Sequence, residues 1–279
     1  MFASENPEES GSPRRLPAGR KADLAKYISD AGEVTVAELA ERFDVSTDTI
    51  RRDLDRLDAD GLVLRTHGGA VSLTSVPRVD TGLDLRLRFH ALAKDSIAAA
   101  AARLVDDNSV IMINAGTTTL ALARQLSEHR GLTVATNSLL IPGEMSPDVY
   151  RGMYVFGGSV HPSDQKTIGA VSFQASSGAI EMDVQCDLVL LGVGAVSIEA
   201  GYSTSNLEEA AMMGEMMERA SRVAILADSS KFGRRLFAQI SELGRADYFV
   251  TDAEPPEELG NALRGAGVQV IVSPATAQQ

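Results

Sequence analysis

The chain has one cysteine, no tryptophan and no apolar run long enough to cross a membrane. The single cysteine, Cys186, excludes an intrachain disulfide framework and gives no support to a thiolate metal cluster. A bilayer-spanning helix needs about 20 consecutive apolar residues, and no segment approaches that length. Residues 1–17 contain acidic residues and prolines but lack the apolar core of a secretory signal. These absences predict a cytoplasmic protein.

Histidine is also scarce. His67, His90, His129 and His161 are scattered, and no pair has the i,i+4 spacing of a metal site on a helix. Surface or structural roles are therefore the simpler interpretation of all four. We expect no metal and no cofactor.

The charge is unevenly distributed along the chain. The net charge is −12, from 26 basic and 38 acidic residues. Residues 1–92 carry 13 basic and 16 acidic side chains, and residues 93–279 carry 13 and 22. DNA binding depends on a local basic surface, so the global acidity does not exclude it. A length of 279 residues predicts two domains more readily than one.

The N-terminal region has the pattern of short helices. Residues 1–18 are polar and contain proline and serine, which predicts a disordered tail. Helical periodicity begins at Gly19, and Gly32 ends the first helix. Thr35 and Glu38 have the spacing of a capping box, which starts a second helix. The apolar face of that short helix comprises Val36, Leu39, Ala40 and Phe43.

A third helix and a hairpin follow. Ser46 is a strong N-cap residue, and only two residues separate it from the second helix. The third helix buries Ile50, Leu54 and Leu57. Residues 62–65 and 70–73 flank a glycine turn, which predicts a β-hairpin. Residues 19–73 therefore read as a winged helix-turn-helix, whose third helix enters the major groove of DNA.

Hydroxyl and basic side chains gather on the N-terminal side of the third helix and on the hairpin. Such groups reach base edges and phosphates. The predicted DNA-binding residues are Ser46, Thr47, Thr49, Arg51, Arg52, Arg65, Thr66 and His67. The alternative is a solvated helix on which the pairs Asp48–Arg52 and Arg51–Asp55 neutralise one another, each pair contributing about 0.2–0.5 kcal/mol.

Residues 74–93 are expected to link two domains. Leu83, Leu85, Leu87 and Phe89 alternate with charged residues, which is typical of a strand. Leu83 and Leu87 would also share one face of a helix. The pattern leaves both structures open.

Residues 94–279 alternate short apolar runs with helical stretches, which predicts an open α/β domain with a largely parallel sheet. This domain is also expected to carry the oligomer contacts. The predicted strands are residues 109–113, 132–136, 153–156, 187–193, 223–227, 248–251 and 268–272, and a helix is predicted over 94–105.

Residues suited to anion binding follow several of these strands. Ligands of open α/β sheets bind at the carboxyl ends of the strands. After the strand at 109–113, a glycine and three threonines begin a helix, whose free amides and dipole attract negative charge. The candidate effector-binding residues are Gly116, Thr117, Thr118, Thr119, Asn137, Gly157, Gly158, Asp228 and Lys231. The alternatives are an ordinary helix cap for the threonines and a surface role for the lysine.

Two sets of motifs carry a family resemblance. Residues 45–54, VSTDTIRRDL, and residues 65–70, RTHGGA, closely resemble the DNA-binding signature of DeoR-type bacterial transcriptional regulators. In that family the segment equivalent to residues 34–53 is the helix-turn-helix. The resemblance implies a double-stranded DNA operator as partner.

Residues 94–251 resemble the DeoR-type sensor domain, through motifs at 116–119, 136–138, 157–158, 192–194 and 228–233. The resemblance implies a fold similar to that of ribose-5-phosphate isomerase. It also implies that a phosphorylated sugar or related metabolite binds here and changes the affinity for DNA.

The chain departs from the family pattern in four places. Asn114 stands where the family often has aspartate, and residues 159–162 lack a basic residue that often follows the paired glycines. Met213 and Gly214 replace a frequent Lys-Arg pair, and residues 172–186 look like a longer insertion. Positive charge is thus lost near a phosphate site.

Two function classes compete on this evidence. We expect a DNA-binding regulator, a repressor of carbohydrate catabolism genes, that is not an enzyme. Because one winged helix reads a short site, at least a homodimer is expected, with higher symmetric states open. The alternative is a sugar-phosphate isomerase fused to a DNA-binding module, with Asp228 as the base and Lys231 stabilising an enediolate.

Overall fold

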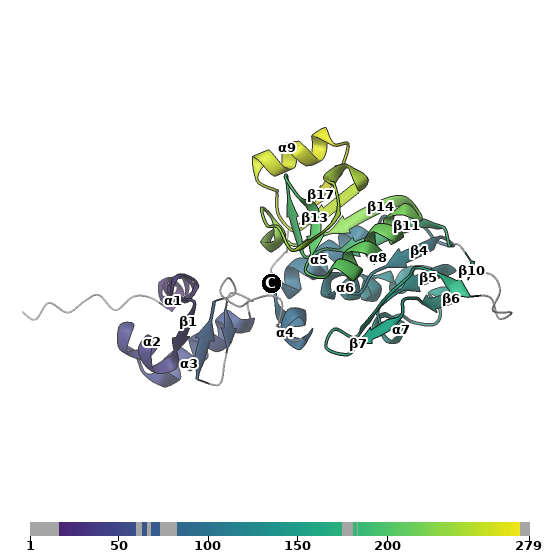
Figure 1. Cartoon of the computed structure of the whole chain (residues 1–279). Helices are drawn as coiled ribbons and strands as arrows, with labels where there is room; N and C mark the ends of the chain where they lie inside the picture. The colour runs from purple at the N-terminus through teal and green to yellow at the C-terminus, as the bar shows by residue number, and fades with distance from the viewer. Residues whose placement is uncertain are drawn as a thin grey trace, which may run out of the picture. The chain divides into compact units, whose positions relative to one another are not determined.

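The chain divides into two compact units, Met1–Thr81 and Gly82–Gln279, each with its own core (Figure 1). The computed structural model describes residues 17–59, 63–65, 68–72, 83–174, 181–182 and 184–273. Residues 1–16 of the expected tail lie outside this range. None of the helices placed by the structure combines the length and apolar character of a transmembrane span.

The first unit contains three helices and a small sheet. The helices are α1 (Pro17–Ala31), α2 (Val36–Arg42) and α3 (Thr47–Ala59), and the strands are β1 (Glu33–Thr35), β2 (Leu64–Arg65) and β3 (Gly69–Val71). The predicted apolar faces meet in one cluster, in which Ile50, Leu54 and Leu57 are fully buried. The helix-turn-helix and the β2–β3 hairpin are confirmed.

The start of α2 is a complete capping box. The Thr35 hydroxyl accepts a hydrogen bond from the Glu38 amide at 3.2 Å, and the Glu38 carboxylate accepts one from the Thr35 amide at 2.7 Å. Two otherwise unpaired donors are satisfied reciprocally, as the spacing predicts. The Thr35 amide, together with the Thr35 hydroxyl that donates to the same carboxylate at 2.9 Å, holds the pKa of the Glu38 carboxyl below its ordinary value.

Strand β1 adds to the hairpin, a feature that the sequence pattern did not predict. The sheet order is β1-β3-β2, with Val34 paired to Ala70 and Thr35 to Gly69. A Cβ atom at Gly69 would lie 2.0 Å from the Val34 carbonyl oxygen, so glycine is required there. Three residues between two helices are too few to show a strand period.

The second unit is a seven-stranded parallel sheet with helices on both faces. Its strands are β4 (Val110–Ile113), β5 (Leu132–Thr136), β6 (Tyr150–Val155), β11 (Cys186–Gly192), β14 (Ala220–Leu226), β16 (Tyr248–Thr251) and β17 (Gln269–Val272). Their order is β17-β16-β14-β11-β4-β5-β6, and every neighbouring pair is parallel. All seven predicted strands are confirmed, with bounds shifted by up to three residues.

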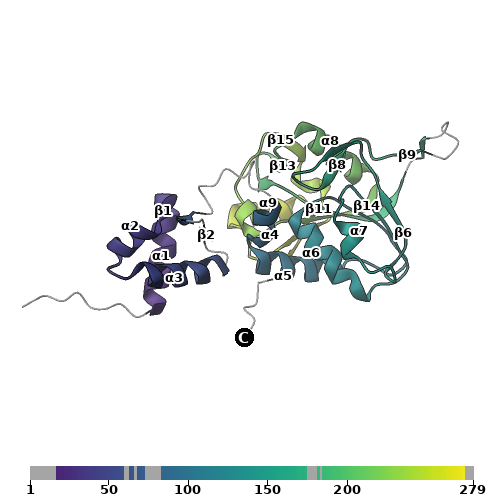
Figure 2. The same ribbon diagram turned by 90° about the horizontal axis from the view of Figure 1, so that it is seen from below.

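Alternating side chains divide the core between the two faces of the sheet. On β4, Ile111 and Ile113 pack in the cluster formed by α5 and α6, whereas Met112 packs in the cluster formed by α8 and α9. Helices α5 and α6 lie side by side (Figure 2). The unit therefore has three layers. Its helices are α4 (Leu83–Arg88), α5 (Ala91–Ala102), α6 (Thr117–Gln125), α7 (Ile141–Glu144), α8 (Leu207–Glu218) and α9 (Glu257–Gly265), with short 3-10 turns η1 (Leu126–Glu128), η2 (Ser229–Lys231) and η3 (Leu243–Arg245).

The second unit also contains smaller antiparallel sheets in addition to the parallel sheet. Strands β7 (Ser159–His161) and β8 (Lys166–Ile168) form a hairpin, and β12 (Ala195–Ser197), β13 (Gly201–Thr204) and β15 (Ala238–Ser241) form a three-stranded sheet. Within the predicted insertion, β9 (Phe173–Gln174) pairs with β10 (Glu181–Met182).

The segment expected to be a linker is shorter than residues 74–93. Residues 73–82 lie outside the described range, but α4 is helical and α5 begins at Ala91. The Lys94 ammonium donates to the carbonyl oxygens of Arg86 and Phe89, which fastens the end of α4 to α5. Residues 83–93 therefore belong to the C-terminal unit. The helical reading of Leu83 and Leu87 holds over the strand reading.

Candidate functional site

The N-terminal turn of α3 presents hydroxyl and basic side chains. The Ser46 hydroxyl accepts from the Thr49 amide at 3.2 Å and lies 2.9 Å from the Thr49 hydroxyl, so it is the N-cap. Thr47, Arg51 and Arg52 are exposed. Arg51 pairs with Asp48 at 3.1 Å, one turn back along the helix. An exposed pair of this kind contributes little, so the Arg51 guanidinium can exchange its partner for a phosphate.

The hairpin part of the predicted DNA surface is described only in its backbone. Arg65 ends β2, but its side chain is not among the described features. Thr66 and His67 lie outside the described residues. Their DNA-binding roles remain predictions from the sequence.

Asn114 lies at the point where the strand order of the parallel sheet reverses. From β4 the chain builds outward through β5 and β6 and then returns to β11 on the other side. The buried Asn114 amide donates to the Gly192 carbonyl at 2.9 Å and accepts from the Gly192 amide at 2.9 Å. Its nitrogen also lies 3.8 Å from the Met213 sulfur. Open α/β sheets bind ligands at such a reversal, and here two hydrogen bonds from Asn114 join the ends of β4 and β11.

The predicted anion site at the start of α6 has the expected backbone. Gly116 is the N-cap and the first turn contains no acidic residue. The first amides of a helix have no partner within it, so those of Thr117 and Thr118 are suited to an anion. Thr119 is fully buried, and its hydroxyl donates to the Asn114 carbonyl at 2.7 Å. Its hydroxyl therefore supports the turn instead of facing a ligand.

Asn137 is likewise fully buried and holds the site together. Its side-chain oxygen accepts from the Ala115 amide at 2.7 Å, and its nitrogen donates to the Thr167 carbonyl at 2.7 Å. It thus links the end of β4 to the β7–β8 hairpin. This positions the start of α6 beside β8.

Gly157 and Gly158 allow the β7–β8 hairpin to approach β6. Gly157 has a φ of +103°, and a Cβ atom there would lie 2.6 Å from the Thr167 hydroxyl oxygen. The Gly158 amide donates to the Ile168 carbonyl at 3.0 Å. Both glycines serve close backbone packing, which brings the hairpin over the carboxyl end of the sheet.

Asp228 and Lys231 follow β14, which β11 separates from β4. Asp228 is buried, caps η2 by accepting from the Ser230 amide at 3.0 Å, and lies 3.8 Å from the Lys231 ammonium. Burial acts to raise the pKa of the Asp228 carboxyl. The charge of Lys231, the Ser230 hydroxyl and the charges of His90 and Lys94 outweigh it, so this pKa lies below its ordinary value.

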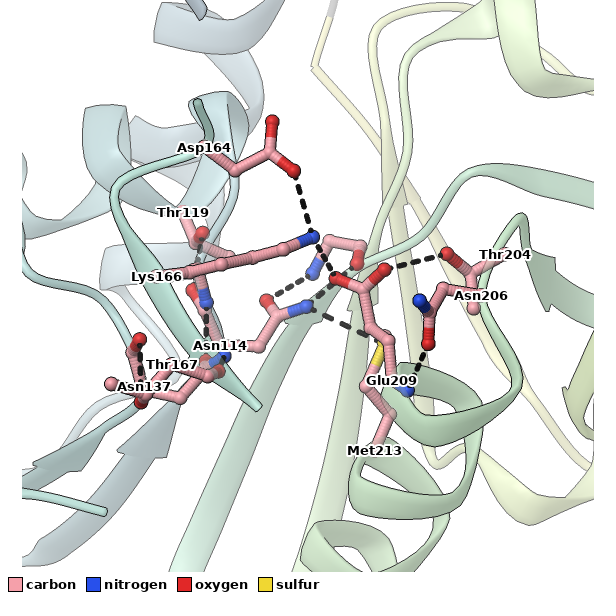
Figure 3. Close-up of polar contacts among 12 residues, drawn as sticks. Asn114, Thr119, Asn137, Asp164, Lys166, Thr167, Thr204, Asn206, Glu209 and Met213 are labelled. Atoms are coloured by element: carbon pink, nitrogen blue, oxygen red, sulfur yellow. Dashed lines mark hydrogen bonds and ion pairs between the residues drawn. The ribbon is translucent and has the colours of Figure 1, made fainter. Parts of the chain in front are cut away.

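A partly buried ion-pair network that the sequence did not predict crosses the carboxyl edge above Asn114 (Figure 3). Lys166 extends from β8 to Glu209 on α8, with 2.8 Å between nitrogen and carboxylate, and lies 3.2 Å from the Asp164 carboxylate. Asp164 also pairs with Arg86 of α4. The Thr204 hydroxyl donates to Glu209 at 3.1 Å. These residues come from three distant segments, α4, the β7–β8 hairpin and residues 204–209, so no local spacing indicates them.

Metal ligands do not gather in the part of the chain that the structure describes. No group of three or more histidine, cysteine, aspartate or glutamate side chains there is arranged to hold a metal ion. Cys186 is buried in β11, and burial together with the nearby charge of Asp187 raises the pKa of its thiol to about 12.

Comparison with known proteins agrees with the two-unit organisation. Residues 20–76 match the model of the DeoR-like helix-turn-helix domain, and residues 90–253 match that of the DeoR C-terminal sensor domain. The HTH-type transcriptional regulator GlpR of Haloferax volcanii is 33% identical over 92% of this chain and 98% of its own length. The putative aga operon transcriptional repressor of Escherichia coli O157:H7 is 30% identical over 96% and 98%. The glycerol-3-phosphate regulon repressor of Escherichia coli K12 is 28% identical over 90% and 97%.

Solved structures are more distant. The chain is similar to ribose 5-phosphate isomerase from Plasmodium falciparum with a TM-score of 0.35 and 12% identity, over 51% of this chain and 52% of the isomerase. This similarity is too weak to carry an argument about function. With a helix-turn-helix unit and a sensor unit that together match both family models, the chain belongs to the DeoR family of DNA-binding transcriptional regulators.

Proposed function

We propose that the chain is a repressor whose operator binding is relieved when a phosphorylated sugar or polyol binds at the carboxyl edge of its parallel sheet. The observation that carries the proposal is the start of α6. A helix start without acidic residues lies beside a hairpin that bears the buried Lys166. Such a site attracts a phosphate through free amides, helix dipole and a nearby cation.

The relatives support the same ligand class. One is named for the glycerol-3-phosphate regulon and another for the aga operon. A regulator of such genes can match their expression to the amount of substrate when it binds a metabolite of the same pathway. We extend this to the present chain as a sugar or polyol phosphate, without choosing among them.

DNA recognition is assigned to α3 and the β2–β3 hairpin. The exposed Arg51 and Arg52 stand on the first turns of α3, which is the groove-facing position in helix-turn-helix proteins. We propose a homodimer as the smallest active form, because symmetric modules bind repeated half-sites. Light scattering of the full chain with and without DNA tests this, and a monomer in both conditions would contradict it.

The alternative activity, isomerisation of a sugar phosphate, has less support. It needs a carboxylate base, and Asp228 is already engaged by Ser230 and Lys231. Its lowered pKa makes it a weak base. Incubation of the chain with ribose 5-phosphate is expected to yield no ketose product.

The repressor proposal is tested by titrating a DNA duplex, selected by the wild-type chain from a random library, in the presence of individual sugar phosphates. At least one sugar or polyol phosphate is expected to weaken DNA binding by tenfold or more. A duplex affinity that no phosphorylated compound changes would exclude this effector class.

A further inference from the structure

A carboxylate lies between two cations at the edge of the effector site. Asp164, in the turn between β7 and β8, accepts a hydrogen bond from the Arg86 guanidinium through one oxygen. Its other oxygen lies 3.2 Å from the Lys166 ammonium (Figure 3). Arg86 comes from α4, 78 residues before Asp164. Two cations from separate elements thus converge on one anion.

Contacts with other elements hold Lys166 and the backbone of Arg86, whereas Asp164 lies on the turn between β7 and β8. Only 10% of the Lys166 side chain is exposed, and its ammonium has a second partner in Glu209 at 2.8 Å. The neighbouring Thr167 is bonded through its backbone to Asn137. Arg86 is fixed through its carbonyl, which accepts from Lys94. The side chains of Asp164 and Arg86 are 31% and 33% exposed. Because Asp164 lies on the turn, its departure would leave Arg86 and Lys166 with only the Glu209 carboxylate as counter-charge.

The Arg86 guanidinium offers more donors than Asp164 uses. Among the described residues, Nε of Arg86 is buried without a hydrogen-bond partner, while Nη2 donates to Asp164. A buried donor left unpaired carries a desolvation cost. A phosphate has a third oxygen, so it can accept from Nε and Nη2 together and still face the Lys166 ammonium.

We propose that Arg86 and Lys166 form the anion subsite of the effector site, and that Asp164 occupies it until the phosphate of the effector takes its place. This inference rests on the proposed function and specifies its chemistry. The two cations supply positive charge that residues 159–162 and the Met213–Gly214 pair lack.

The first test removes the negative charge of Asp164, which competes with phosphate for Arg86 and Lys166. Asp164→Asn keeps the shape of the side chain, and the affinity of the full-length variant for inorganic phosphate and for glycerol 3-phosphate is expected to rise about tenfold in calorimetry. Asp148→Asn is the control, because it changes the net charge equally at an exposed position just before β6, at the amino edge of the sheet. It is expected to bind as the wild type does.

The second test removes the cations. Arg86→Gln and the double variant Lys166→Met/Glu209→Gln are each expected to lower the affinity for glycerol 3-phosphate about tenfold or more. The double variant avoids an unpaired buried carboxylate, and thermal unfolding verifies that it is folded. Arg151→Gln, an exposed cation at the start of β6, is the control for lost positive charge.

The outcomes separate the subsite from the proposed function. If Asp164→Asn binds phosphate no better than Asp148→Asn, including the case in which neither binds, the subsite is wrong. If the wild type releases its DNA duplex in response to a sugar phosphate while the Asp164, Arg86 and Lys166 variants bind that compound unchanged, the repressor proposal stands without the subsite. If Asp164→Asn gains phosphate affinity but no sugar phosphate changes DNA binding, the subsite stands and the effector class falls.

Discussion

Asn114 holds both backbone polar groups of Gly192, donating to the carbonyl oxygen and accepting from the amide, each at 2.9 Å. This double hydrogen bond joins β4 to β11 where the strand order reverses. An amide side chain supplies both a donor and an acceptor, whereas an ionised carboxylate only accepts. The junction of β4 and β11 at the candidate site therefore depends in part on one side chain.

Asn114→Asp tests that dependence. An ionised carboxylate keeps the bond from the Gly192 amide but faces the Gly192 carbonyl without a donor, so we expect a loss of about 1–3 kcal/mol in the free energy of unfolding at pH 7. Protonation of the introduced carboxylate would restore the donor, which raises the pKa of that carboxyl in the folded state. The loss should thus shrink as the pH falls toward about 4, near the ordinary pKa of an aspartate. Urea titrations that give the same loss at both pH values would contradict this reading.

Arg51→Ala and Arg52→Ala are each expected to weaken DNA binding. A phosphate-contacting arginine should lower the salt slope of log K by about one unit, and a base-reading one should cost about 1–3 kcal/mol and relax sequence preference. Fluorescence anisotropy with the selected duplex measures both effects over a range of salt concentrations. Arg151→Ala, in the sensor unit, is the control. Wild-type affinity in the Arg51→Ala/Arg52→Ala double variant would exclude α3 as the recognition helix.

Asp228 should make the free energy of unfolding of the sensor unit depend on pH in the acidic range. The pKa of the Asp228 carboxyl is lowered in the folded chain, so its ionised form stabilises the fold at pH values above the ordinary pKa of an aspartate. This stabilisation is lost as the pH falls through the lowered pKa of the folded state. The difference in unfolding free energy between the wild type and Asp228→Asn should therefore be largest near neutral pH and decrease toward pH 3. A difference that does not vary with pH would show that Asp228 is not ionised in the way described.

Cys186 reports on opening of the parallel sheet. Because burial and the Asp187 charge raise the pKa of its thiol to about 12, iodoacetamide at pH 8.5 should leave the native chain unlabelled. Labelling should begin only as urea unfolds the sensor unit, which mass spectrometry can follow. Reaction of the native chain at the rate of a free thiol would contradict the buried placement of β11.

The elements that sequence predicts well are those with a strong local period. Ile50, Leu54 and Leu57 mark α3 by helical spacing, and the apolar runs mark all seven parallel strands. Strand β1 was not predicted because three residues are too few to show a period. Helix α4 was ambiguous because the spacing of Leu83 and Leu87 fits both a strand and a helix. Local pattern decides an element only when its period is repeated.

The sheet edge at which the candidate residues lie was predictable, but their contacts were not. Strand ends placed Gly116, Asn137 and Asp228 at one edge of the sheet, as the rule for open α/β sheets predicts. Their contacts assign Asn137 and Thr119 to holding the site together. The charges that line it come from α4, β8 and α8, and their meeting is a product of tertiary folding that no spacing encodes.

The most direct test of the account is the effect of glycerol 3-phosphate, ribose 5-phosphate and glucose 6-phosphate on the affinity of the full chain for its selected DNA duplex, measured for the wild type and for Lys231→Ala. At least one of these compounds should weaken DNA binding by the wild type tenfold or more. The variant should bind DNA normally without the compound and respond only at a concentration roughly 10- to 150-fold higher, because a charge-assisted hydrogen bond contributes about 1.5–3 kcal/mol. A wild-type affinity that none of the three compounds changes would contradict the account, and a variant that responds at the wild-type concentration would exclude Lys231 from the effector site.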